Sequence, residues 1–161
     1  MEKQPSTEES GISGAKWIAF SGSMKSTPQM DAYAVRAIDK ALLQGNFLFI
    51  GDNPNGVDWA ILNHLMTKQV PRMQYTICTA AQERPRSVAR LNGQPFNSLK
   101  RFEDYVNRDR CMVEFADVTM CIWDGQSKGT RGTFDYACEI GRLAYLIQID
   151  YNNKVVMQCS V

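Results

Sequence analysis

The stretch WDGQSKGTRGT, at residues 123–133, combines residue types that are suited to holding an anion. Glycines let backbone N–H groups approach a ligand without a Cβ in the way, and hydroxyl side chains donate to phosphate oxygens. The residues that would form such a cradle are Gly125, Ser127, Gly129, Thr130 and Thr133. Lys128 or Arg131 would complete the neutralisation of charge. The alternative is a plain connector between a strand and a helix, with Thr133 as the N-cap of that helix.

Two aspartates are the candidates for acid–base chemistry. Asp58 follows Gly56 by two residues and would orient a ribose hydroxyl or act as a general acid or base. Asp135, two residues after Thr133, is the carboxylate nearest to the loop. Each has a structural alternative: Asp58 as an early-helix carboxylate that accepts from backbone donors, and Asp135 as a charge that stabilises the amino end of a helix.

The order of apolar runs predicts the elements that must position these residues. Strands are expected over residues 16–20, 46–50, 73–80, 118–123, 144–150 and 154–160. Helices are expected over residues 31–45, 57–68, 102–116 and 133–143. Strands that alternate with helices imply right-handed crossovers and a mostly parallel sheet with helices on both faces. The expected fold class is therefore α/β, a three-layer sandwich, with an antiparallel edge strand at the C-terminal end.

Three turns rich in glycine and polar residues follow strand ends, at residues 21–23, 51–56 and 125–133. The carboxyl ends of parallel strands lie at one edge of a sheet, and open α/β sheets bind ligands beyond that edge. We therefore expect the three turns to converge into one cleft that receives an anion.

The remaining composition sets the organisation of the chain. Residues 1–14 are polar and acidic and predict a flexible leader, which leaves residues 15–161 as a single domain. Residues 81–99 are polar and basic, and would form either a lid over an anionic ligand or a solvated loop. The net charge of +1 gives no large electrostatic field for DNA or a membrane. Five cysteines without a C-x-x-C pair argue against disulfides and zinc, so we expect a cytoplasmic protein with no metal and no cofactor.

Three stretches resemble the SLOG superfamily, which includes the Lonely Guy phosphoribohydrolases and the DprA-type domains. They are MVEFADVTMCIWDGQSKGTRGTFDYA at 112–137, FIGDNPNGVDWAI at 49–61 and FSGS at 20–23. The pattern is most similar to small bacterial and phage domains of that superfamily. The resemblance implies a Rossmann-like nucleotide-binding fold and leaves the activity open, because one fold hosts many functions.

The resemblance also assigns a role to each turn. The residues that would line the base, the ribose and the second wall are Gly22, Ser23, Gly51, Gly56 and Asp58. The loop at 123–133 would hold phosphate or ribose hydroxyls, and Arg108 with Asp109 would stand at the rim of the pocket.

The chain departs from the enzymes of that superfamily at one position. Lonely Guy enzymes carry a P-G-G-x-G-T-x-x-E loop whose glutamate acts at the glycosidic bond, whereas here Thr133 stands three residues after Thr130 and the proline is absent. Glu139 resembles the glutamate of nucleoside deoxyribosyltransferases, but it follows Thr133 by six residues, about 9 Å of helical rise. Glu139 is therefore expected to be structural.

The leading hypothesis is a module that binds a small phosphorylated nucleoside: a nucleotide, a signalling nucleotide or an ADP-ribose-like molecule. A homodimer is expected, whereas nucleic acid and membranes are not expected as partners. The alternative is an N-glycoside hydrolase, a nucleotide phosphoribohydrolase or deoxyribosyltransferase-like enzyme, that acts on a nucleoside monophosphate with Asp58 or Asp135 as the catalytic carboxylate. A DNA-processing accessory domain is a third alternative.

Overall fold

The computed structural model describes residues 14–80, 101–102 and 104–161. The strands are β1 (Trp17–Gly22), β2 (Phe47–Gly51), β3 (Tyr75–Ala80), β4 (Arg101–Phe102), β5 (Val118–Trp123), β6 (Ala144–Ile149) and β7 (Val155–Cys159). The helices are α2 (Pro28–Leu43), α3 (Gly56–Thr67), α5 (Tyr105–Phe115) and α6 (Lys128–Ile140), and a short 3-10 turn (Arg72–Gln74) precedes β3. The basic segment at 81–99 and all of the expected leader except Gly14 lie outside the described residues.

The seven strands form one sheet in the order β4-β3-β2-β1-β5-β6-β7. Neighbouring strands are parallel, except for the antiparallel pair of β6 and β7. The order reverses direction at β1, because β2 and β3 lie on one side of it and β5 and β6 on the other. Such a switch point is where open α/β sheets place their ligand sites. The expected α/β sandwich with an antiparallel C-terminal edge is confirmed.

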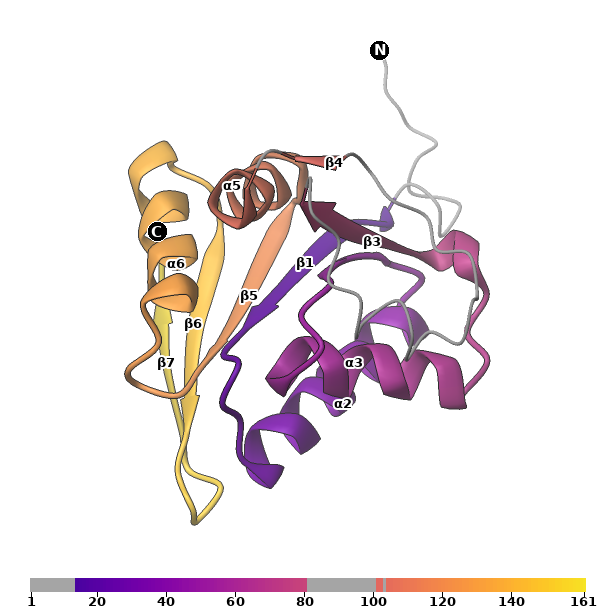
Figure 1. The fold of residues 1–161 in the computed structure, drawn as a ribbon, viewed down its shortest axis with the longest axis horizontal. Coiled ribbons are helices and arrows are strands. Elements are labelled where there is room, and N and C mark those ends of the chain that lie inside the picture. Colours follow the sequence, from indigo (N-terminus) through magenta and orange to yellow (C-terminus); the bar gives the residue numbers. More distant parts are fainter. Residues whose placement is uncertain (1–13, 81–100, 103) are drawn as a thin grey trace.

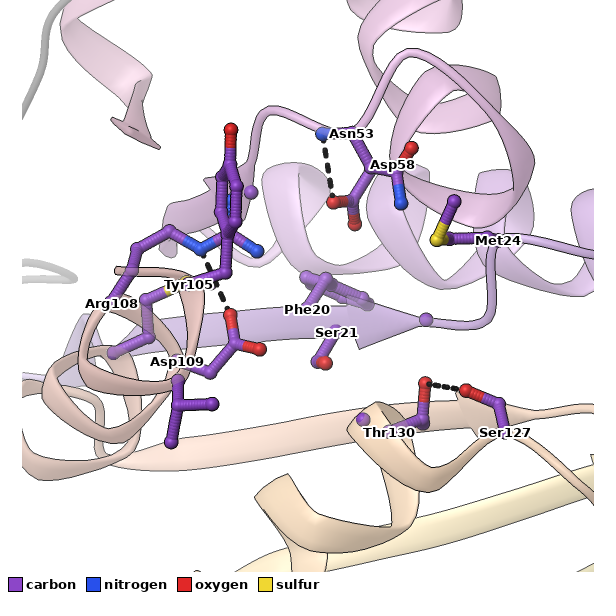
Figure 2. A pocket seen from close by; sticks show the side chains of 15 residues that line it. Phe20, Ser21, Met24, Asn53, Asp58, Tyr105, Arg108, Asp109, Ser127 and Thr130 are labelled. Atoms are coloured by element: carbon purple, nitrogen blue, oxygen red, sulfur yellow. Dashed lines mark hydrogen bonds and ion pairs between the residues drawn. The ribbon is translucent and has the colours of Figure 1, made fainter. Parts of the chain in front are cut away.

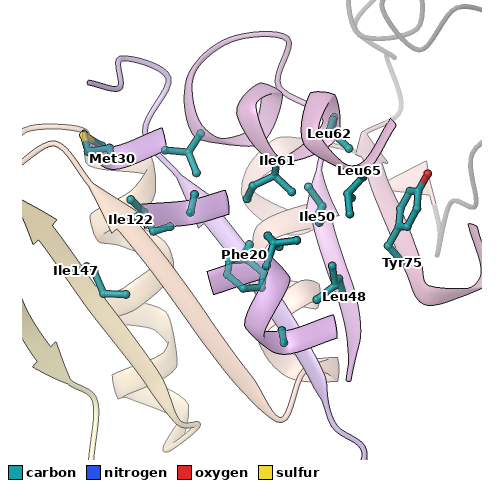
Figure 3. Packing of buried hydrophobic residues seen from close by; sticks show 14 of the residues in the cluster. Phe20, Met30, Leu48, Ile50, Ile61, Leu62, Leu65, Tyr75, Ile122 and Ile147 are labelled. Atoms are coloured by element: carbon teal, nitrogen blue, oxygen red, sulfur yellow. The ribbon is translucent and has the colours of Figure 1, made fainter. Parts of the chain in front are cut away.

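Helices cover both faces of the sheet. Figure 1 shows α2 and α3 on one face and α5 and α6 on the other. In β2, Leu48 and Ile50 point into the cluster under α2 and α3, whereas Phe49 joins the cluster under α5. All three side chains are buried, which explains why β2 reads as a continuous apolar run. Figure 3 shows the larger cluster, in which Phe20 and Ile50 of the sheet pack with Ile61 of α3.

The last helix begins earlier than the sequence predicts. Its first residue is Lys128 instead of Thr133, so about half of the stretch at 123–133 is helical. Ser127 occupies the N-cap position, and its side chain makes no capping hydrogen bond. The hydroxyl of Thr133 donates to the carbonyl of Gly129 at 3.0 Å, inside the helix. The alternative in which Thr133 is the N-cap is therefore wrong. Glycines at 129 and 132 hide the helical periodicity in the sequence, because glycine has a low helix propensity.

The end of β1 and the start of α3 are in close contact. The N–H of Val57 donates to the carbonyl of Ser23 at 3.1 Å. A Cβ on Gly22 would lie 2.2 Å from Cβ of Val57, and a Cβ on Gly56 would lie 2.2 Å from the carbonyl oxygen of Ser23. Gly56 also has a φ of +71°, a conformation that other residues rarely adopt. These two glycines therefore hold the first two turns of the ligand edge against each other.

The cysteines form no disulfides, and the described helices are not of the membrane-spanning kind. All five cysteines are free, and burial raises the pKa of the Cys78 thiol to about 12, so that thiol is unreactive near neutral pH. Among the described residues, no helix is both long enough and apolar enough to cross a lipid bilayer.

Candidate functional site

A pocket of about 220 Å³ opens at the carboxyl edge of the sheet. Its wall comes from four parts of the chain: the end of β1 with the residues that follow it, the segment from the end of β2 to the first turn of α3, the first three turns of α5, and the start of α6. Figure 2 shows these side chains around the end of β1. The expected site residues that line the pocket are Gly22, Gly51, Asp58, Arg108, Asp109, Ser127, Gly129 and Thr130.

Four other expected residues lie beside the pocket and shape its loops. Ser23 is buried, and its hydroxyl accepts a hydrogen bond from the N–H of Asp124 at 3.0 Å. Gly125 has a φ of +86° and packs against the side chain of Gln148 in β6. Gly56 lies against the carbonyl of Ser23, and the hydroxyl of Thr133 donates to the carbonyl of Gly129. These residues support the pocket wall without lining it.

The two expected carboxylates have different places. Asp58 lies in the pocket wall and is buried. Asp135 is exposed on α6, where its Oδ1 accepts from Nε of Arg131 at 3.0 Å. The structure therefore brings Asp58 to the pocket but not Asp135.

The sequence did not single out several residues of this site. Those that line the pocket are Phe20, Ser21, Met24, Asn53, Tyr105, Val106 and Met112. Asp52 is a further one, because it pairs with Arg108 of the pocket wall. Ser21, Asp52 and Asn53 lie in the turns after strand ends that the sequence assigns to the cleft, although it does not name them as site residues. Tyr105 and Met112 carry no such signal, because their side chains reach the site only through the docking of α5.

A buried ionic cluster surrounds Arg108. Its Nη1 lies 2.6 Å from Oδ1 of Asp52, and its Nε lies 2.9 Å from Oδ1 of Asp109. The side chains of Arg108 and Asp52 are 6% and 4% exposed, so solvent screens this pair little. Burial opposes the charge on Arg108, but Asp109, Asp58 and Asp52 together outweigh it and raise the pKa of the guanidinium. Arg108 therefore stays charged and joins α5 to the end of β2.

Asp58 titrates near neutral pH. Burial raises the pKa of its carboxyl from 3.8 to about 7; Arg108 opposes this rise, and Asp109 and Asp52 add to it. One oxygen, Oδ2, accepts the N–H of Asn53 at 3.2 Å. The pocket wall thus carries a carboxyl group that is protonated below pH 7 and ionised above it.

The interior of the pocket does not suit a phosphate. With Asp58 protonated, Asp52 and Asp109 contribute two negative charges and Arg108 one positive charge, which leaves a net charge of −1. A phosphate placed here would meet this negative charge in a region with little solvent screening. Binding of an anion is favoured only at the edge of the pocket, on the side of α6.

The amino end of α6 forms that edge. Oδ1 of Asp124 accepts the N–H groups of Gln126 and Ser127 at 2.9 and 2.7 Å, so the loop amides are already occupied. No acceptor among the described residues bonds to the next three N–H groups, those of residues 128–130. These groups carry the partial positive charge of the helix terminus. The pocket thus has a positive rim, which we define as the first turn of α6, residues 128–131.

Of the two cations in the same turn, Lys128 adds positive charge, whereas Asp135 neutralises Arg131. Lys128 is exposed. The guanidinium of Arg131 lies 5.6 Å from the ring centroid of Trp123, while it also pairs with Asp135. The indole N–H of Trp123 donates to the carbonyl of Ser127 at 2.9 Å. Trp123 therefore fixes the loop that leads into the rim.

The fold and the site define a Rossmann-like α/β protein with one pocket at the switch point of its described sheet. No protein-family model matches the chain, and no curated protein matches it. A solved structure of DNA processing protein A (DprA) from Helicobacter pylori matches it with a TM-score of 0.65 and 14% sequence identity. The match covers 94% of this chain and 72% of that protein, and that work describes a single-stranded DNA binding mode. The match shows the Rossmann-like fold, whereas the SLOG superfamily and its bacterial and phage subgroup stay predictions.

This comparison corrects two expectations. The expected ligand, a small phosphorylated nucleoside, is contradicted, because the matched protein is one whose described ligand is single-stranded DNA. The correction includes the hydrolase alternative, which acts on the same class of ligand. The exclusion of nucleic acid as a partner is contradicted by the same match. The physical reason is that a net charge near zero conceals a local separation of charge, in which an acidic pocket adjoins a positive rim.

Proposed function

We propose that this protein binds single-stranded DNA along the carboxyl edge of its sheet. The observation that carries the proposal is the match of 94% of the chain to the fold of a DNA processing protein A for which a single-stranded DNA binding mode is described. The positive rim supports it, because single-strand binding depends on contacts to the phosphate backbone.

In this proposal the phosphates lie outside the pocket. One phosphate contacts the open N–H groups of residues 128–130, and Lys128 neutralises part of its charge. The carboxylates of the interior keep the backbone of the strand at the rim. The expected site residues retain their place at the edge of the sheet, but their ligand is a segment of a strand.

We place the binding function in a single domain at residues 15–161, with residues 1–14 as a leader. A homodimer and a cytoplasmic location also stay predictions.

Replacing Lys128 with alanine is expected to weaken the binding of single-stranded DNA several-fold. The loss should be the same for different base sequences, because a phosphate contact carries no sequence information. The plot of log affinity against log salt concentration should become less steep by about 0.7, the value for one phosphate contact on a single strand. Fluorescence anisotropy with a labelled oligonucleotide at several salt concentrations measures both effects.

Lys68→Ala is the matched control. Lys68 is exposed and lies at the carboxyl end of α3, about 18 Å along the helix from Gly56. Its loss should leave affinity and salt dependence unchanged. No binding of single-stranded DNA to the parent protein at low salt would overturn the proposed function. An equal loss in both variants would show that net charge decides binding, and would remove the assignment to the rim.

A further inference from the structure

One edge of the described sheet is an apolar strand without a neighbour. β7 is the last strand of the sheet, at the end opposite to β4, and Figure 1 shows it beyond β6. All five of its residues are exposed, and none of them is charged. Val155, Val156 and Met157 are 40%, 60% and 49% exposed. Soluble proteins protect such an edge with charges, proline or a covering segment, and among the described residues β7 has none of these.

The backbone groups of β7 alternate between β6 and the open edge. The N–H of Ser160 donates to the carbonyl of Ala144 at 2.9 Å, and the carbonyl of Lys154 accepts from the N–H of Asp150 at 3.1 Å. Successive residues of a strand direct their backbone groups to opposite sides, so the even-numbered residues of β7 bond to β6. The backbone groups that face away from the described sheet are those of the odd-numbered residues, Val155, Met157 and Cys159.

We infer that β7 pairs with β7 of a second copy of this chain, antiparallel and about a two-fold axis at Met157. This inference names the surface of the expected homodimer, and it does not depend on the binding of DNA. In this register Met157 lies opposite Met157 of the partner subunit, and Val155 lies opposite Cys159 of the partner subunit. Each of these facing pairs exchanges two backbone hydrogen bonds, because every member directs its N–H and C=O to the open edge.

The side chains of β7 suit a copy of the same strand. Met157 lies opposite Ile147 of β6, which belongs to the cluster under α2. Met157 therefore stands on the α2 face of the sheet, and so does Val155, two residues before it. Pairing covers these apolar side chains and brings no charges together, because Lys154 is about 20 Å along the strand from its counterpart. A second copy supplies the matching apolar strand by itself, and two-fold dimers are the commonest oligomers.

The pairing leaves the ligand edge of each copy open. It joins the two sheets into one, with α2 and α3 of both copies on the same face. Because β6 and its counterpart then run in opposite directions, the two carboxyl edges lie at opposite ends of the strands. No residue of β7 lines the pocket, and none belongs to the positive rim. Each copy of the dimer therefore keeps its own site.

The test is sedimentation velocity of the parent protein and the Met157→Lys variant over a series of concentrations. The parent should be a dimer, and the dissociation constant of the variant should be at least about tenfold higher, because two lysines meet at the axis. Met73→Lys is the matched control and should dimerise as the parent does. Met73 is 78% exposed and lies in the turn before β3, towards the other end of the sheet.

Hydrogen exchange of single amides locates the pairing. In the parent dimer the amides of Val155 and Cys159 should exchange slowly, and in Met157→Lys they should exchange fast. The amides of Val156 and Gln158 bond to β6 and should be slow in both proteins. If Met157→Lys fails to fold, as circular dichroism would show, exchange in the parent dimer decides: fast exchange at Val155 and Cys159 would overturn the pairing.

The other outcomes are equally distinct. A monomeric parent protein would overturn the inference, and slow exchange at the outward amides of that monomer would show that another segment of the chain covers the edge. Equal dissociation constants for Met157→Lys and Met73→Lys would place the dimer interface elsewhere and overturn the inference as well. None of these results bears on the binding of single-stranded DNA, which anisotropy measures separately.

Discussion

Replacing Arg108 with methionine is expected to lower the free energy of unfolding by about 3–5 kcal/mol, because it removes the cation from a buried ionic cluster. Asp52 and Asp109 would lose the guanidinium that lies 2.6 and 2.9 Å from their carboxylate oxygens. Asp52 is almost fully buried, so water cannot replace that partner without opening the structure. Urea unfolding followed by circular dichroism at neutral pH measures the change.

Two further variants test whether the loss of stability comes from the ionic cluster. Arg108→Lys should recover little of the loss, because a point charge cannot bond to two carboxylates in the way that the guanidinium fork does. Arg110→Met is the matched control: Arg110 is exposed, and its contact with the ring of Tyr136 is worth less than about 1 kcal/mol. If Arg108→Met and Arg110→Met have similar stabilities, the cluster does not hold α5 to the sheet as described.

Replacing Asp58 with asparagine is expected to make the folded protein more stable than the parent above pH 7. The pKa of Asp58 is about 7 in the folded protein and 3.8 as its ordinary value. Between these two values the folded state holds a proton that the unfolded state releases, so the parent loses about 1.4 kcal/mol of stability per pH unit as the pH rises. The variant lacks this proton, so its stability relative to the parent should increase from about pH 4 to about pH 7 and then level off.

The measurement is the unfolding free energy of both proteins at a series of pH values. The amide of the variant keeps an oxygen for the N–H of Asn53, so the local hydrogen bond is preserved. Asp135→Asn serves as the control, because its ion pair with Arg131 is exposed and contributes less than about 1 kcal/mol. A difference between parent and Asp58→Asn that does not change with pH would mean that Asp58 is already ionised in the folded protein.

Much of the fold is predictable from the sequence. Apolar runs such as Phe47–Gly51 and Val118–Trp123 are strands buried on both faces, and such strands indicate a parallel sheet between helix layers. The antiparallel edge follows from two apolar runs that are joined at Tyr151, Asn152 and Asn153, because asparagine is typical of turns. The sequence places the start of α6 too late, because glycines within its first turns have a low helix propensity, which the packing of the helix overrides.

The site is less predictable, because its chemistry depends on contacts between distant residues. The placement of Asp58 and Arg108 near the ligand edge follows from their motifs. The pairing of Arg108 with Asp52 joins residues 56 positions apart, and only the docking of α5 produces it. The docking of α5 brings Asp109 and Asp52 together around Arg108 and makes the interior of the pocket acidic. The sequence does not reveal this contact, and it therefore predicts a phosphate cradle throughout the cleft. The glycine-rich turns do converge, but only the rim at α6 offers positive charge.

The most direct test of the proposed function is a ¹H–¹⁵N correlation spectrum of the protein, recorded while single-stranded DNA is added. The account predicts that the amide signals of residues 128–131 and of the loop after β2, residues 52–55, shift with the added strand. The signals of Lys16 and Asp117, at the opposite edge of the sheet, should not change. Shifts confined to that opposite edge, or no shifts at any residue, would contradict a binding site at the rim of the pocket.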